Sequence, residues 1–256
     1  MRITVCELPH EEKPLQSAWA ALCEHTTLAR SDLVVLPEFA FAPPVWEFER
    51  FDSSVWAAAQ AQCDLWLARL PELHVQCVIG THPATIDGKP FNEGFMWSPS
   101  SGLRSLRSKC FLPDEPGGWE ARWFTRAERA FPTYSAGSLK FGLNICTELW
   151  ALDTYAEYAK QRVQAVVAPR ATAAATTNKW LSVGTVAAVR SGAFCLSSNR
   201  VHPDGSCGGV GWIISPDGHL LGSTSQAAPF CTEEVDLAAS VAASKTYPRY
   251  VFEASV

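Results

Sequence analysis

The chain has no run of about 20 apolar residues, the length that a helix needs to span a bilayer. Basic residues form no cluster and the formal net charge is -5, so the sequence lacks the cationic surface that nucleic acid or an anionic membrane binds. The opening residues, MRITVCELPHEEKP, contain neither a basic segment nor a long apolar one, unlike a secretory signal. We therefore expect a cytoplasmic protein whose partner is a small molecule.

Paired cysteine spacings are also missing. The chain has nine cysteines, an odd number, and no CxxC pair, which argues against a disulfide framework and against the common zinc motifs. Most of the cysteines lie inside apolar segments, as Cys6, Cys77 and Cys195 do. This placement is typical of small buried side chains in a reducing compartment.

Apolar residues, in contrast, are abundant. The hydrophobic fraction is 47%, the charged fraction is 18%, and there are ten tryptophans in 256 residues. A composition of this kind favours strands that are covered on both faces, or a surface that is buried in an oligomer. We find no repeat, linker or low-complexity tract, so we expect one domain over 1–256.

Short apolar runs alternate with longer amphipathic segments along most of the chain, and this alternation predicts βαβ units and a largely parallel sheet. Residues 111–137 interrupt the pattern with Pro, Gly, charge and aromatics together, and we interpret them as an ordered loop that lines a site. A hairpin is expected around Ser215–Gly218. The other predicted strands are 2–8, 33–39, 75–83, 91–99, 102–110, 139–146, 165–172, 193–201 and 234–237, and the predicted helices are 14–30, 53–70, 154–163 and 178–192.

Three of the apolar segments each lead into one reactive side chain. LVVLPEF carries Glu38, SLRSKCFLP carries Lys109, and LKFGLNICTELW carries Cys146. Taken alone, each residue is typical of a surface charge or a core cysteine. Taken together, a carboxylate, an ammonium and a thiol at the ends of strands can form a base, an oxyanion stabiliser and a nucleophile.

The same segments resemble the nitrilase, or carbon–nitrogen hydrolase, superfamily along nearly the full chain. VVLPEF is similar to the family's glutamate strand, LRSKCFLP to its YRKxHLP segment, and FGLNICTELW to its GxxICxExxxP segment. AVVAPRAT, the Asn199-Arg200 pair and GWIISPDGHLL resemble later elements of the family. The chain departs from the pattern at Phe111, where carbamoylase-like members have histidine, and in LWALDTY, which lacks the usual Pro-Glu.

The resemblance implies an α/β fold, a four-layer αββα sandwich of two mixed sheets with helices outside. It implies that Glu38 takes the proton of Cys146, and that Lys109 and the backbone N–H of Thr147 stabilise the oxyanion. The cation beside the thiol is expected to favour the thiolate. WEARWF resembles a family segment with a second glutamate, which makes Glu120 our choice over Glu115. No metal or organic cofactor is needed.

We expect hydrolysis of a non-peptide carbon–nitrogen bond in a small amide or N-carbamoyl compound through a cysteine thioester. A nitrile substrate, acyl transfer to an amine, or a catalytically silent scaffold of the same fold are the alternatives. A papain-like protease lacks its histidine signature, and a zinc hydrolase lacks its ligand spacing. The residues that stand near the expected site and can bind substrate are Thr147, Arg122, Arg126, Arg170, Trp119, Trp123 and Trp150.

The resemblance also implies a homodimer or a larger even-numbered homo-oligomer. Family members pair through the helix that follows the nucleophile, here TYAEYAKQRV at 154–163. The apolar tail at about 245–256 is expected to contribute to that interface.

Overall fold

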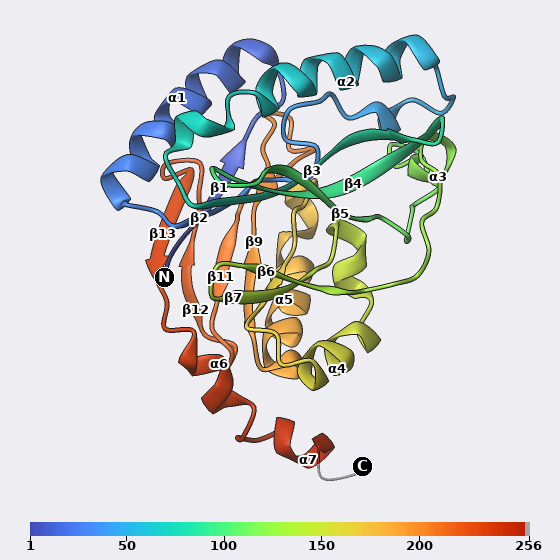
Figure 1. The fold of residues 1–256 in the computed structure, drawn as a ribbon. Coiled ribbons are helices and arrows are strands. Elements are labelled where there is room, and N and C mark those ends of the chain that lie inside the picture. Colours follow the sequence, from blue (N-terminus) through green and yellow to red (C-terminus); the bar gives the residue numbers. More distant parts are fainter. Residues whose placement is uncertain (254–256) are drawn as a thin grey trace.

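A computed structural model of the chain describes residues 1–253 and places two β-sheets face to face (Figure 1). The first sheet has the strand order β10-β1-β2-β3-β4-β5, and β13 pairs with β1. The strands β10, β1, β2 and β3 are parallel, while β3, β4 and β5 form an antiparallel meander. Their bounds are β1 (Arg2–Leu8), β2 (Leu33–Val35), β3 (Cys77–Ile86), β4 (Lys89–Ser98), β5 (Gly102–Ser108), β10 (Asn199–Arg200) and β13 (Phe230–Glu234).

The second sheet has the order β12-β11-β9-β8-β7-β6. Its central strands β7, β8 and β9 are parallel, and antiparallel pairs flank them on both sides. The bounds are β6 (Thr133–Ala136), β7 (Leu139–Leu143), β8 (Ala165–Val167), β9 (Phe194–Ser197), β11 (Trp212–Ile214) and β12 (Leu220–Ser223).

The long helices cover the outer faces of the two sheets (Figure 1). Helices α1 (Glu12–Ala29) and α2 (Ser53–Leu67) lie on the first sheet, and α4 (Asp153–Lys160) and α5 (Thr177–Ser191) lie on the second. The predicted αββα sandwich is therefore confirmed. The short elements are the 3₁₀ turns η1 (Val45–Glu47), η2 (Leu70–Leu73), η3 (Cys146–Trp150) and η4 (Ala174–Thr176), and the helices α3 (Glu120–Trp123), α6 (Ala238–Ala243) and α7 (Arg249–Glu253).

The apolar runs of the sequence follow from this layering. Successive side chains of a strand point to opposite faces, and here both faces are covered. In β2, Leu33 and Val35 pack between the sheets while Val34 packs under the helices. In β8, Val166 packs under helices α4 and α5, whereas Val167 lies between the sheets. Such strands contain no solvent-facing position, so they carry no polar alternation.

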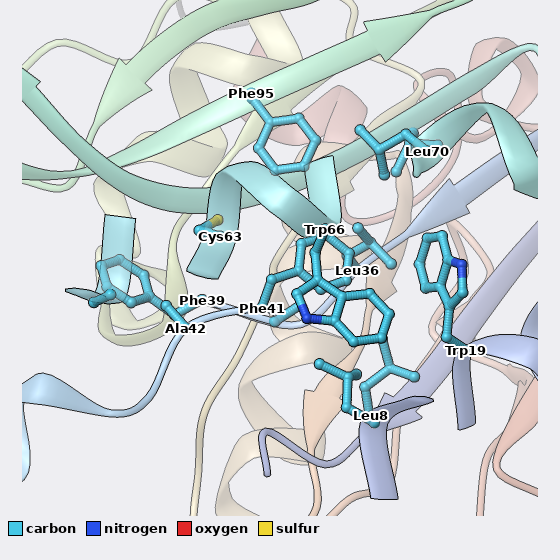
Figure 2. Packing of buried hydrophobic residues seen from close by; sticks show 14 of the residues in the cluster. Leu8, Trp19, Leu36, Phe39, Phe41, Ala42, Cys63, Trp66, Leu70 and Phe95 are labelled. Atoms are coloured by element: carbon cyan, nitrogen blue, oxygen red, sulfur yellow. The ribbon is translucent and has the colours of Figure 1, made fainter. Parts of the chain in front are cut away.

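Aromatic side chains fill the layer between the first sheet and its helices (Figure 2). Trp66 of α2 stacks on Phe41 with ring centroids 5.8 Å apart, and Trp19 of α1 meets Phe41 edge-on at 5.4 Å. Leu8 and Leu36 are fully buried beside them. Burial of one such leucine contributes about 1.5–3 kcal/mol, so this layer fixes the segment that carries Glu38.

Several sequence predictions differ from the structure. The strands predicted over 139–146 and 165–172 end at Leu143 and Val167, and the one predicted over 193–201 divides into β9 and β10, which belong to different sheets. The strand predicted over 33–39 ends at Val35, because the chain turns there and Phe39 adopts a positive φ of 49°. The final strand is β13 at Phe230–Glu234 rather than 234–237, because its pairing with β1 ends at the Arg2–Glu234 pair. The predicted loop 111–137 is ordered, but it also contains α3 and β6.

The C-terminal segment from residue 245 packs against the part of the molecule that contains the second sheet, through one buried residue. Arg249 is 3% exposed and donates hydrogen bonds to the carbonyls of Val189 and Pro216. The nearby Tyr247 and Phe252 are largely exposed. The predicted interface role of 245–256 stays a prediction, and residues 254–256 lie outside the described residues. Among the residues that are described, no helix combines the length and the apolar character that crossing a membrane requires.

Candidate active site

The three predicted reactive residues come from three strand ends that meet between the sheets. Glu38 follows β2, Lys109 follows β5, and Cys146 begins η3 after β7. The exposed fractions are only 1% for Glu38, 1% for Lys109 and 4% for Cys146. Ionisable groups are rarely buried to this extent without a partner, so their arrangement needs a chemical explanation.

Lys109 lies between two carboxylates. Its Nζ donates to Glu38 Oε1 at 2.8 Å and lies 2.8 Å from both carboxylate oxygens of Glu120. Asn92 Nδ2, from β4, donates to the same Glu38 oxygen at 2.7 Å. These bonds hold Glu38 from two directions. The competing Glu115 is exposed in a turn, where it pairs only with Gly118.

The buried charges of this cluster do not balance, because two carboxyl groups face one ammonium. Burial alone would lower the pKa of Lys109, but the charges of Glu120 and Glu38 outweigh it and keep that pKa well above the ordinary lysine value. Burial raises the pKa of Glu120 to about 7 although Lys109 opposes it, and the charge of Glu38 adds to the rise. Lys109 is therefore a permanent cation, while Glu120 titrates near neutrality.

Cys146 stands on a sharp turn. Its φ is +49°, a left-handed conformation that non-glycine residues adopt rarely and at a cost of about 1–3 kcal/mol. The turn is held because the Cys146 N–H donates to the Pro169 carbonyl at 2.9 Å. A second bond joins the two sheets, since the Glu38 N–H donates to the Arg170 carbonyl at 3.1 Å. The backbone thus fixes the segments of Glu38 and Cys146 relative to one another.

The pKa of the Cys146 thiol differs from our expectation that Lys109 would favour a thiolate. Burial and the charge of Glu38 both raise the pKa of Cys146, and Lys109 only partly offsets them, so the pKa lies well above the ordinary value. The resting site therefore holds a neutral thiol. A nucleophile of this kind needs a base that removes its proton during attack.

A buried ion pair supports the turn that carries Cys146. Glu148, in η3, accepts hydrogen bonds from the Ile145 N–H at 2.9 Å and from the Cys110 N–H at 2.7 Å. Both of its oxygens also pair with the guanidinium of Arg107, on β5. Glu148 thereby joins the turn that carries Cys146 to the strand end that carries Lys109.

Among the predicted substrate-binding residues, Arg122 and Trp123 lie on α3. Arg122 is at the surface, where it pairs with Asp114 at 2.8 Å and Glu49 at 2.6 Å. Trp123 is 1% exposed, and its indole N–H donates to the Phe48 carbonyl at 2.6 Å. The structure gives neither residue a contact with Cys146, and their role in substrate binding stays a prediction.

Two more of the predicted residues, Thr147 and Arg170, lie close to Cys146. Thr147 follows Cys146 in η3, where the N–H groups of the first turn have no partner inside the helix. Arg170 is completely buried and donates to Ser197 at 2.7 Å, Thr172 at 2.8 Å and the Val210 carbonyl at 2.6 Å. Its substrate-binding role stays a prediction as well.

Sequence reasoning missed the supporting residues Asn92 and Arg107. Asn92 lies in an apolar strand, FNEGFMW, where a buried amide is unusual. Arg107 lies two residues before Lys109, so in an extended segment both side chains point to the same face. Glu148 had a clearer signal, because a glutamate three residues into a helix turn often accepts from the backbone N–H at its start.

Comparisons with known proteins agree with this arrangement. The family model described as carbon-nitrogen hydrolase matches residues 2–245. No curated protein sequence matches the chain.

Solved structures share the fold at low sequence identity. A carbon-nitrogen hydrolase from Helicobacter pylori G27 is 18% identical with a TM-score of 0.85, covering 98% of this chain and 94% of that one. An amidase variant from Nesterenkonia sp. AN1, with the acetamide moiety of fluoroacetamide covalently added at its active-site cysteine, is 16% identical with a TM-score of 0.75 and covers 100% and 97%. XC1258 from Xanthomonas campestris, with an arsenic adduct in its active site, is 16% identical with a TM-score of 0.72 and covers 98% and 96%. The motif resemblance is confirmed by these matches, and the chain belongs to the carbon–nitrogen hydrolase family.

Proposed function

We propose that this chain is an amidase-type hydrolase that converts a small amide into a carboxylic acid and ammonia through a thioester on Cys146. The observation that carries the proposal is the buried cluster in which Lys109 Nζ lies 2.8 Å from Glu38 and from Glu120. Its burial excludes bulk water, which strengthens every charge interaction inside the site. The covalent adducts at the cysteine of the related amidase add support.

In the first half of the reaction, Glu38 takes the proton of the Cys146 thiol as sulfur bonds to the amide carbon. The carbonyl π electrons move to oxygen, and the oxyanion is stabilised by the Lys109 ammonium and the backbone N–H of Thr147. The oxyanion then reforms the carbonyl and expels the nitrogen, which receives the proton from Glu38. Ammonia leaves and the thioester remains.

In the second half, water attacks the thioester carbon while Glu38 accepts a proton from it. The tetrahedral intermediate collapses, sulfur leaves with that proton, and the carboxylic acid is released. Lys109 keeps its charge throughout, because its pKa is held far above neutrality. Glu120 orients the ammonium and takes no proton from the substrate.

The test is intact-mass spectrometry and ammonia release with a panel of small amides. Wild type is expected to gain the mass of the acyl group, and Cys146→Ala is expected to gain none and to release no ammonia. Cys63→Ala removes another buried thiol, on α2, and serves as the matched control. Undiminished ammonia release by Cys146→Ala, with native circular dichroism, would refute the proposal.

The assembly and location of the chain are part of this proposal. We infer that the chain works as a homodimer in the cytoplasm. The dimer is supported by the apolar side chains of Trp150 on η3, Leu152 after it and Val186 on α5, which are 46–51% exposed. Light scattering tests the dimer, and a monodisperse monomer would refute it.

A further inference from the structure

Two histidines that are far apart in the sequence meet at one edge of the first sheet. Strands β1 and β10 are parallel, and Leu8 pairs with Arg200 in their register. His10 and His202 each lie two residues beyond that pair. Their rings stack with centroids 5.4 Å apart and an interplanar angle of 24°.

Glu11 adds a carboxylate to the pair. One ligand atom from each of His10, Glu11 and His202 lies within 4.8 Å of the others. Glu11 Oε1 is 2.7 Å from His202 Nε2. Within the described chain, His10 Nδ1 and Glu11 Oε2 are buried atoms that have no hydrogen-bond partner. Buried polar atoms of this kind are rare and indicate a missing partner.

Asp204 orients one of the histidines from outside. Its Oδ1 lies 2.6 Å from His202 Nδ1, so the carboxylate faces the ring nitrogen that is remote from Glu11. A carboxylate on the second ring nitrogen is the usual support of a metal-bound histidine, because it fixes the tautomer and raises the basicity of the other nitrogen.

We propose that His10, Glu11 and His202 bind one Zn²⁺ ion. Two imidazoles and one carboxylate suit zinc rather than Mg²⁺ or Ca²⁺, which prefer oxygen ligands. Tetrahedral bonds of about 2.1 Å place ligand atoms about 3.4 Å apart. Atoms that lie up to 4.8 Å apart therefore need to close by about 1.4 Å at most, whereas Glu11 Oε1 and His202 Nε2, now 2.7 Å apart, need to open by about 0.7 Å. Rotation of these half-buried side chains supplies that movement.

The fourth coordination position is open to solvent. Glu11 and His202 both line a cavity of about 490 Å³, from which water reaches the ion. The site takes no part in amide hydrolysis. Its effect is to join the loop before α1 to the loop after β10. Arg200, at the end of β10, donates to the carbonyl of Phe39, the residue next to Glu38.

The test is a Zn²⁺ titration by isothermal calorimetry on the full chain, reduced, stripped with chelator and carrying Cys146→Ala to remove the reactive thiol. We expect one Zn²⁺ per chain. His10→Ala and His202→Ala are expected to weaken binding at least tenfold, and Asp204→Asn about tenfold, because outer-sphere partners typically contribute 10–100-fold. His219→Ala removes an exposed histidine elsewhere and is the matched control, with unchanged binding expected.

Cobalt substitution identifies the ligand atoms, which matters because the chain has nine cysteines. We expect visible d–d bands without the near-ultraviolet charge-transfer band that thiolate ligands produce. Circular dichroism verifies that each variant is folded, and Glu11→Gln replaces any histidine variant that is not. The proposal is overturned if Zn²⁺ does not bind, if these variants bind it like the parent, or if the Co²⁺ spectrum shows sulfur ligation.

Discussion

Replacement of Glu148 by alanine is the sharpest test of how the nucleophile is held. The side chain of Glu148 is completely buried and accepts from the Ile145 N–H, the Cys110 N–H and the guanidinium of Arg107. Alanine removes all of these bonds at once. Arg107, whose side chain is only 5% exposed, then remains buried without its counter-charge.

The expected loss follows from that isolated charge. Removal of one member of a buried ion pair costs about 3–5 kcal/mol, because the other charge stays desolvated and unpaired. For a chain of this size each kcal/mol lowers the melting temperature by about 2–4 °C. We therefore expect Glu148→Ala to melt about 6–20 °C below wild type and to lose amide hydrolysis, since the turn of Cys146 loses its support.

Urea unfolding followed by tryptophan fluorescence measures the free energy of unfolding directly. Glu157→Ala is the matched control, because its pair with Lys160 is about 60% exposed at both ends and should change the stability by less than about 0.5 kcal/mol. Arg107→Met in the Glu148→Ala background removes the unpaired charge. That double variant is expected to regain part of the lost stability.

Two results would contradict this reasoning. A loss below about 1 kcal/mol in Glu148→Ala would mean that the pair is not effectively buried in solution. A double variant that is less stable than Glu148→Ala alone would mean that packing of Arg107, and not its charge, is what matters.

Two other predictions concern a titrating group and a close contact. Because the native pKa of Glu120 is about 7 and the ordinary value is 4.5, the native state retains a proton that the unfolded chain has released. The stability of wild type should fall relative to Glu120→Gln between about pH 5 and 7, by at most about 1.4 kcal/mol per pH unit. If the urea midpoints of the two proteins differ by the same amount at pH 5, 6, 7 and 8, the prediction is contradicted. Gly142→Ala puts a Cβ 2.3 Å from the ring of Tyr158 and should lower stability by about 1–3 kcal/mol in thermal unfolding, whereas Gly118→Ala, with its nearest atom at 3.6 Å, should not; equal melting temperatures would refute the clash.

The sequence was most informative where the apolar pattern of a strand reflects its burial on both faces. Residues 33–36, LVVL, and 165–168, AVVA, are apolar throughout because both faces of these strands are covered, so their burial was predictable, whereas the αββα sandwich was implied by the family resemblance. The reactive residues Glu38, Lys109 and Cys146 were recognisable because the segments VVLPEF, LRSKCFLP and FGLNICTELW resemble motifs of the family. Their positions at strand ends needed no knowledge of the tertiary contacts.

Features that depend on pairing between distant segments were not predictable. Asn92 contacts Glu38 across 54 positions of the sequence, and nothing near it indicates that partner. The meeting of His10 with His202 depends on the register of β1 with β10, which only the folded sheet defines. The neutral state of the Cys146 thiol likewise depends on complete burial, which the neighbouring residues Thr147 and Glu148 did not suggest.

The bond from the Glu38 N–H to the Arg170 carbonyl has a consequence for biosynthesis. Glu38 belongs to the first sheet, whereas Cys146 and Arg170 belong to the ends of strands in the second. During translation Glu38 emerges long before Cys146, and the first sheet is still missing β10 and β13 when Cys146 emerges. The proposed site therefore becomes complete only when the two sheets have docked.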